Sequence, residues 1–124
     1  MKVKRIAIGI MGLRESLKEF SDTWKSLEAG RKLKKREEIY FDSIDSMRAM
    51  LTNNRLLILK AIREYKPKSI YELARILGRD LKNVNQDLKL LSEMGLVSLE
   101  RKDTDKRRII PHVDYSKIFL EIPV

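Results

Sequence analysis

The stretch "SIYELARILGRDLKNVNQDLKLLSEMG" (residues 69–95) contains two helical patterns joined by a glycine. Ser69 and Glu72 form the S-x-x-E signature of a capping box, in which side chains satisfy backbone N–H groups at the start of a helix. Gly78 can take the left-handed conformation that ends a helix, and Asp80 can cap the next one. The stretch therefore predicts a short helix, a tight turn and a longer helix. In the short helix we expect an inward face of Leu73, Ile76 and Leu77.

The longer helix, over residues 80–94 and closed by Gly95, has two different faces. Its apolar residues recur at helical spacing on one stripe, namely Leu81, Val84, Leu88 and Leu91. The opposite face carries Lys82, Gln86, Lys89 and Glu93. Side chains that donate or accept hydrogen bonds fill the first two turns. We therefore expect a polar partner to lie along this outer face.

The flanking segments complete a recognisable order of elements. Thr52 or Asn53 can cap a preceding helix, "NNRLLILKAIREY", which must end before Pro67 because proline lacks a backbone N–H. After Gly95, "LVSL" (96–99) begins a strand, the charged "RKDTDK" forms a turn and "RRIIP" returns as a second strand. This order, a helix, a short helix, a turn, a longer helix and a hairpin, is that of a winged helix-turn-helix. The first helix is expected to bury Leu56, Ile58, Leu59, Ile62 and Tyr65.

A winged helix-turn-helix suits DNA because the major groove admits one α-helix, while a hairpin wing can reach the flanking phosphates. Amide side chains can bond adenine, and basic side chains can bond guanine or phosphate. Two alternatives stay open: the helix can pack on a partner protein, and the charged hairpin run can be a solvated tip. The residues expected to contact DNA are Ser69, Arg79, Lys82, Asn83, Asn85, Gln86, Lys89, Arg101, Lys102, Lys106 and Arg107.

The fuller pattern "LTNNRLLILKAI…SIYELARILGRDLKNVNQDLKLLSEMGLV", within about residues 51–111, resembles winged helix-turn-helix transcriptional regulators of the MarR and ArsR kind. It is also similar to a family of small predicted regulators of archaea and bacteria, some of which are thought to act as antitoxins. The resemblance implies the fold and a role in transcription. Where that family commonly has N-V-H-R-D, this chain has "NVNQD", so Asn85 and Gln86 replace a histidine and an arginine. The resemblance therefore implies no particular operator.

The N-terminal third predicts a strand–helix–strand unit. "VKRIAIGI" (3–10) and "EEIYFD" (37–42) are typical of short strands, and Gly30 can end an amphipathic helix between them. The basic run "RKLKKR" (31–36) is either a solvated connector or a DNA-contacting arm. A unit of ~40 residues cannot bury the apolar stripe of its helix alone, so the stripe packs on the winged helix or forms a dimer or partner interface. That stripe consists of Leu13, Leu17, Phe20, Trp24 and Leu27.

These patterns predict an α+β, mainly α protein: a winged helix-turn-helix with an N-terminal strand-helix-strand extension. We expect residues 1–42 to form the dimerisation or partner-binding unit and residues 43–124 to form the DNA-binding domain. Asp42 is a candidate cap for a helix that uses Ile44, Met47 and Leu51.

Composition excludes several kinds of site. The 124 residues include no cysteine and one histidine, so thiolate and His-rich metal sites are excluded, and we expect no metal and no cofactor. Motifs of phosphate-binding loops, zinc peptidases and serine hydrolases are absent, so we expect no catalytic residues. Asp87 borders the apolar stripe and is expected to pair with a nearby arginine or amide. The net charge of +9 favours a nucleic-acid partner.

The apolar run near the N-terminus is shorter than the ~18 residues of a membrane span, so we expect a cytoplasmic protein without a membrane partner. The sequence leads to two main hypotheses. The first is a sequence-specific DNA-binding transcriptional regulator, a repressor that binds double-stranded DNA as a homodimer. The second is an antitoxin that binds a toxin protein through its N-terminal unit and regulates its own operon. A protein that coats DNA nonspecifically is a third reading, in which the amides of Asn83, Asn85 and Gln86 would have no role.

Overall fold

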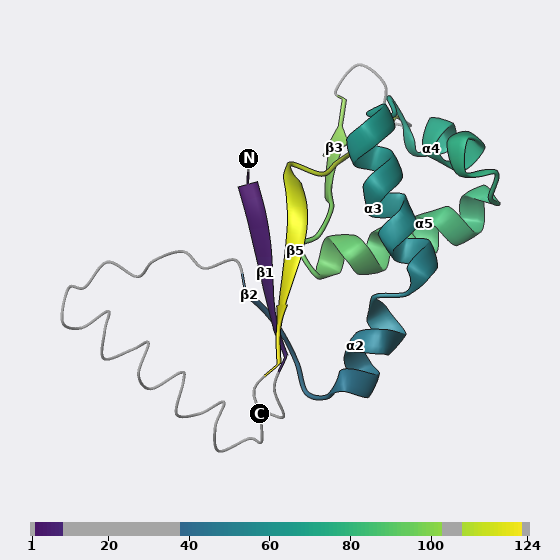
Figure 1. Ribbon diagram of the computed structural model, residues 1–124. Helices are drawn as coiled ribbons and strands as arrows, with labels where there is room; N and C mark the ends of the chain where they lie inside the picture. The colour runs from purple at the N-terminus through teal and green to yellow at the C-terminus, as the bar shows by residue number, and fades with distance from the viewer. Residues whose placement is uncertain (1, 9–37, 103–107, 123–124) are drawn as a thin grey trace. The chain divides into compact units, whose positions relative to one another are not determined.

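The computed structural model describes residues 2–8, 38–102 and 108–122 (Figure 1). The chain divides into two compact units, one of Val3–Arg48 with Lys117–Val124 and one of Ala49–Ser116. Strand β5 (Tyr115–Glu121) begins in the second unit and continues into the first. This strand was not predicted from the sequence, and it pairs with the N-terminal strand of the first unit.

The first unit contains a three-stranded sheet with the order β2-β1-β5. Strands β1 (Lys2–Ile8) and β2 (Glu38–Phe41) confirm the two predicted strands, and they pair in parallel with Ile6 opposite Ile39. Parallel neighbours cannot be joined by a tight hairpin turn and require a longer crossover connection. The predicted apolar stripe between residues 13 and 27 and the basic run 31–36 lie outside the described residues.

Helix α2 (Ile44–Met50) follows β2 after two residues and buries none of its side chains. Its cap is Ser43, whose Oγ accepts a hydrogen bond from the backbone N–H of Ser46 at 3.1 Å. The expected cap at Asp42 was wrong because Ser43, not Asp42, directly precedes the first helical residue. Leu51 lies just after the helix.

The second unit has the predicted order of elements. Helices α3 (Asn53–Tyr65), α4 (Ile70–Leu77) and α5 (Leu81–Glu93) are followed by the antiparallel strands β3 (Ser98–Arg101) and β4 (Ile109–His112). This is a winged helix-turn-helix. Side chains from all three helices and from the segment after α5 form its core, where the most completely buried are Ile58, Leu73, Val84, Leu88, Leu91 and Leu96.

The predicted caps fix where these helices begin and end. Thr52 Oγ1 accepts from the N–H of Arg55 at 3.2 Å, and Ser69 Oγ accepts from the N–H of Glu72 at 3.0 Å. The Glu72 carboxylate accepts from the N–H of Lys68, one residue before the position used in a regular capping box. Gly78 ends α4 with a φ of 63°, a conformation that favours glycine. The turn between α4 and α5 is therefore specified locally.

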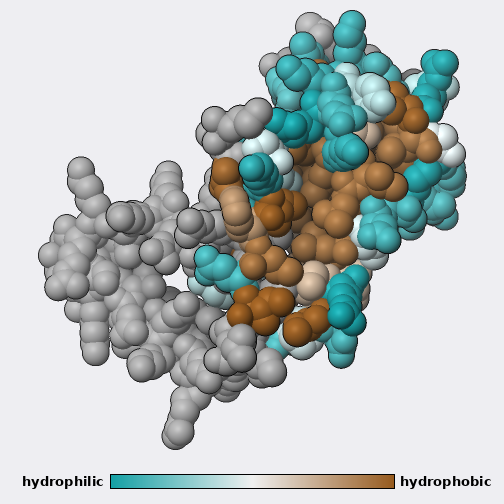
Figure 2. Space-filling model, in the orientation of Figure 1, coloured by the Kyte–Doolittle hydropathy of each residue, from teal (hydrophilic) through white to brown (hydrophobic). Residues whose placement is uncertain are grey.

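Three expectations about burial in α3 and α4 were wrong. On α3, Leu56 and Tyr65 are exposed and Ala61 is buried, and Figure 2 shows hydrophobic residues at the surface over this helix. Leu56 precedes Ile58 by two residues and so points to the opposite side of the helix, while Tyr65 is the last helical residue. On α4 the inward stripe begins at Ile70 and continues through Leu73 and Ala74, which turns Ile76 outward.

Tyr115 anchors the start of β5 in the second unit. Its side chain is buried, and its hydroxyl donates to the carbonyl oxygen of Leu96 at 2.8 Å. Burial, together with the neighbouring Asp114 carboxylate, raises the pKa of the Tyr115 hydroxyl far above its ordinary value. The hydroxyl is therefore a neutral donor at physiological pH.

Candidate nucleic-acid interface

The outer face of α5 presents polar side chains to solvent. Val84, Leu88 and Leu91 are buried on the inner side and hold the helix against the core. The five predicted contact residues of this helix are exposed, and they are Lys82, Asn83, Asn85, Gln86 and Lys89. The structure thus brings the amides and two ammonium groups together on one helix, with the helix itself firmly packed.

Leu81 belongs to this exposed surface, contrary to the expectation that it is buried. It is the first residue of α5 and its side chain is 39% exposed. Asp80 takes the N-cap position but makes no side-chain capping hydrogen bond. A leucine at the start of the helix lies one turn away from the core stripe that Val84 begins, so it is only partly covered. The N-terminal turn of α5 therefore offers an apolar group beside Lys82 and Asn85.

The end of β3 and the start of β4 add basic side chains. Arg101, Lys102 and Arg108 are exposed, and the backbone N–H of Lys102 donates to the Arg108 carbonyl at 3.4 Å, which closes the described part of the hairpin. Lys106 and Arg107 lie outside the described residues. Arg108 was not among the predicted contacts, although it ends the same charged run. Its Nε donates to the carbonyl oxygen of Lys68 at 3.1 Å, which joins the wing to the start of α4.

His112 and Glu100 form a diagonal pair across the same hairpin. The His112 Nε2 and Glu100 Oε2 atoms are 2.6 Å apart, and both side chains are about half exposed. No role for His112 was predicted from the sequence. Here it joins the two strands of the wing near their base.

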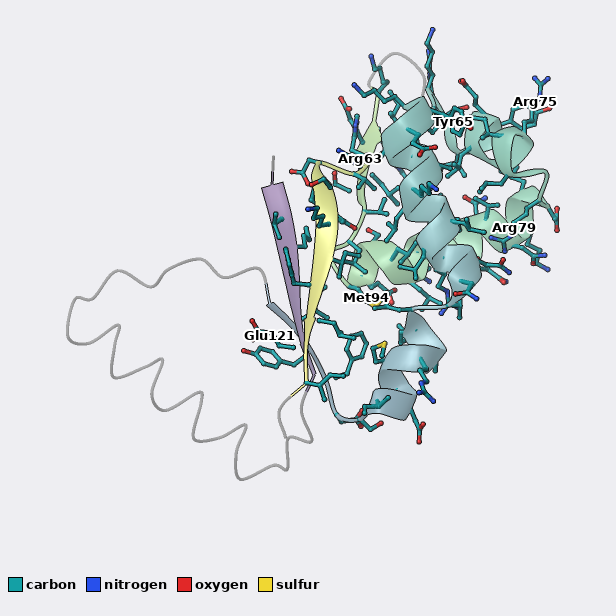
Figure 3. The ribbon with its side chains drawn as sticks, viewed as in Figure 1. Arg63, Tyr65, Arg75, Arg79, Met94 and Glu121 are labelled. Carbon is teal, nitrogen blue, oxygen red and sulfur yellow. The ribbon has the colours of Figure 1, made fainter. Side chains whose placement is uncertain are left out.

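Arg79 is placed differently from the other predicted contacts. Its Nη2 donates to Asp87 Oδ2 at 2.9 Å, and its side chain is 26% exposed at the turn between α4 and α5 (Figure 3). The prediction that Asp87 pairs with a nearby arginine is confirmed. The Arg79 guanidinium, which was predicted to contact DNA, therefore pairs with a side chain of α5.

Helix α4 contributes further groups to the surface. Ser69, a predicted contact, uses its oxygen to cap the helix, and a hydroxyl that accepts one bond can still donate another. Tyr71 and Arg75 are exposed one turn apart on α4, and Figure 3 shows Arg75 pointing away from the other helices. Neither residue was among the predicted contacts, although their i, i+4 spacing and their position outside the apolar stripe were visible signals.

Other kinds of site find no support in the part of the chain that the structure describes. Among residues 2–8, 38–102 and 108–122 no group of three histidine, cysteine or acidic side chains could hold a metal ion. None of the helices in these ranges is both long and apolar enough to cross a membrane.

Three helices, the tight α4–α5 turn and the β3–β4 hairpin define a winged helix-turn-helix protein. Residues 50–120 match the model of the HVO_A0114 family, and the chain belongs to this family. No match was found among curated proteins.

Among solved structures, the chain is similar to three regulators. They are a MarR-like transcriptional regulator from Thermotoga maritima (19% identity, TM-score 0.45), AbfR of Staphylococcus epidermidis (22%, 0.48) and the transcriptional regulator BldR from Sulfolobus solfataricus (21%, 0.46). The matches cover 83%, 82% and 83% of this chain and 65%, 62% and 69% of the other chains. The chain thus spans slightly less than two thirds of the first two proteins. At these identities the likeness concerns the fold alone.

Proposed function

We propose that this protein is a sequence-specific DNA-binding transcriptional regulator that reads the major groove with α5 and contacts phosphates with the β3–β4 wing. The observation that carries the proposal is the outer face of α5. Lys82, Gln86 and Lys89 lie on this face, and Asn83 and Asn85 flank it on either side. All five are exposed, on a helix whose other side is buried in the core. An exposed helix of this kind fits the width of the major groove.

The chemistry of that face supports base reading as well as phosphate binding. Asn and Gln can make paired hydrogen bonds to adenine, whereas Lys bonds guanine or neutralises phosphate. Among the described residues, the amides of Asn83, Asn85 and Gln86 have no hydrogen-bond partner within the protein, so they are available to a ligand. Arg101, Lys102 and Arg108 supply positive charge where β3 ends and β4 begins.

A repressor that binds as a homodimer is the form of regulation that we propose. One recognition helix covers a short stretch of duplex, and two protomers can place their helices in successive major grooves ~34 Å apart. The predicted stripe that includes Trp24 is our candidate for the dimer interface. The same stripe is the candidate surface of the antitoxin alternative, which stays a prediction.

Selection from random duplexes, followed by footprinting and salt titration, tests the proposal. We expect one enriched sequence, protection in its major groove, and a log affinity that falls with log salt at about −0.9 for each phosphate contact. Lys60→Ala, on the exposed side of α3, is a charge-matched control that should bind like the wild type. No enriched sequence, or a flat salt dependence, would contradict the proposal.

A further inference from the structure

Arg55 occupies a position that a helix by itself disfavours. It is the third residue of α3, where the positive end of the helix dipole opposes a cation. Three hydrogen bonds account for its presence there. Its Nε donates to Asp87 Oδ1 at 3.1 Å, and its Nη1 donates to the carbonyl oxygens of Ala49 and Met50, each at 2.9 Å. One guanidinium therefore joins the end of α2 to the middle of α5.

The groups that Arg55 joins, the last carbonyls of α2 and the Asp87 carboxylate of α5, are placed so that a movement of one affects the other. Ala49 and Met50 are the last residues of α2, and the final carbonyls of a helix have no partner within it. The side chains of Arg55 and Asp87 are only 16% and 15% exposed, so their ion pair is less screened than one at the surface. Arg79 holds the second oxygen of the same carboxylate.

Helix α2 is only partly covered in the described part of the chain. It buries no side chain, and segments with few buried contacts move most readily. It also passes from the first unit, which includes Arg48, into the second, which begins at Ala49. A shift of the C-terminal end of α2 would therefore act directly on the Arg55 guanidinium.

We propose that Arg55 is a positioning residue that couples the C-terminal end of α2 to the DNA-reading helix through Asp87. Asn83 precedes Asp87 by one turn on α5, so the two lie on the same side of the helix. A rotation of α5 that follows Asp87 moves Asn83 relative to the base edges. The inference rests on the proposed function, because it concerns how accurately α5 is placed in the groove. Displacement of the C-terminal end of α2 changes sequence preference more than overall affinity.

Four variants test the coupling through the ratio of affinities for the selected duplex and for a random duplex of equal length. Arg55→Met removes all three hydrogen bonds, and Asp87→Asn removes the negative charge while keeping the shape. Arg55→Lys can keep the ion pair, but one ammonium cannot also reach both carbonyls as the planar guanidinium does. Lys60→Met, on the exposed side of the same helix, is the matched control.

We expect Arg55→Met, Arg55→Lys and Asp87→Asn to lower the ratio by ~10-fold or more, a loss equal to about one mismatched base pair. Affinity for the random duplex and the salt slope should stay as in the wild type, because no proposed phosphate contact has been removed. Near-ultraviolet circular dichroism at the assay temperature verifies that each variant is folded. If Arg55 and Asp87 only stabilised the fold, the folded variants would keep the wild-type ratio of affinities for the two duplexes.

Hydrogen exchange supplies a reciprocal measurement, since coupling between two sites acts in both directions. The selected duplex should slow exchange of the α2 amides in the wild type and have no such effect in Asp87→Asn. A wild-type ratio in Arg55→Lys, or α2 protection that persists in Asp87→Asn, would overturn the coupling and leave the proposed function standing. A wild-type protein that binds no duplex would overturn both.

Discussion

Gln86 and Lys89 lie one turn apart on the outer face of α5 and are both exposed, yet they should contribute to binding in different ways. Among the described residues, Gln86 makes no hydrogen bond within the protein. Gln86→Ala should therefore change the free energy of unfolding by less than about 0.5 kcal/mol. Its effect on DNA should be much larger, because the loss of a paired contact to a base costs about 1–3 kcal/mol.

On the selected duplex, Gln86→Ala should weaken binding by roughly 5- to 150-fold. On a random duplex it should have little effect, and the salt slope should not change. Lys89→Ala is expected to weaken both duplexes alike and to make the slope about 1 unit shallower, as expected when a phosphate contact is lost. The two variants together separate base reading from charge neutralisation on one helix.

Fluorescence anisotropy with labelled duplexes at four or more salt concentrations gives both the affinities and the slopes. Lys60→Ala serves as the control for a lost positive charge away from α5 and the wing. Equal weakening of both duplexes by Gln86→Ala would show that this amide does not read a base. An unchanged slope in Lys89→Ala would show that its ammonium contacts no phosphate.

Three further predictions follow from individual side chains. Trp24→Asp should give monomers that keep the winged-helix fold, lose cooperative binding to a two-half-site operator and retain weak nonspecific binding; light scattering that finds a monomeric wild type would contradict the dimer. Tyr115→Phe should lower the free energy of unfolding by about 1–3 kcal/mol, since the buried Leu96 carbonyl loses its donor; urea unfolding measures it, and a negligible change would refute the argument. Exposed Leu81 should contact a thymine methyl, so replacing that thymine by deoxyuridine should cost the wild type about 1 kcal/mol and Leu81→Ala nothing further.

The sequence predicted those features of the winged helix that local chemistry determines. Ser69 and Gly78 act within a few residues of themselves, so a capping pattern and a positive-φ glycine could be identified without the fold. The outer face of α5 was predictable for the same reason, since helical spacing separates it from the buried stripe. The structure confirms the predicted caps at Thr52 and Ser69, the glycine that ends α4 and the exposed polar face of α5.

Pairing between segments far apart in the sequence could not be predicted from local patterns. The side chains of Arg55 and Asp87 are 32 positions apart in sequence, and nothing in the spacing shows that they meet. The partnership of β5 with β1 joins the two ends of the chain, which periodicity alone could not reveal. One signal was nevertheless present: a cation in the first turn of α3 conflicts with the helix dipole, and such conflicts often mark a tertiary contact or a functional site.

The net charge of the protein does not show which of its basic side chains are available to contact DNA. Two arginines of the second unit, Arg55 and Arg79, are directed at one carboxylate inside the fold, where they hold α5 in place. A protein that coated DNA by charge alone would gain more by exposing both to phosphates. Arginines that fix the orientation of a helix, beside amides left exposed on its outer face, are instead the arrangement that base reading requires, because paired hydrogen bonds to a base tolerate little error in position. This division of the basic side chains favours a reader of sequence over a nonspecific DNA coat.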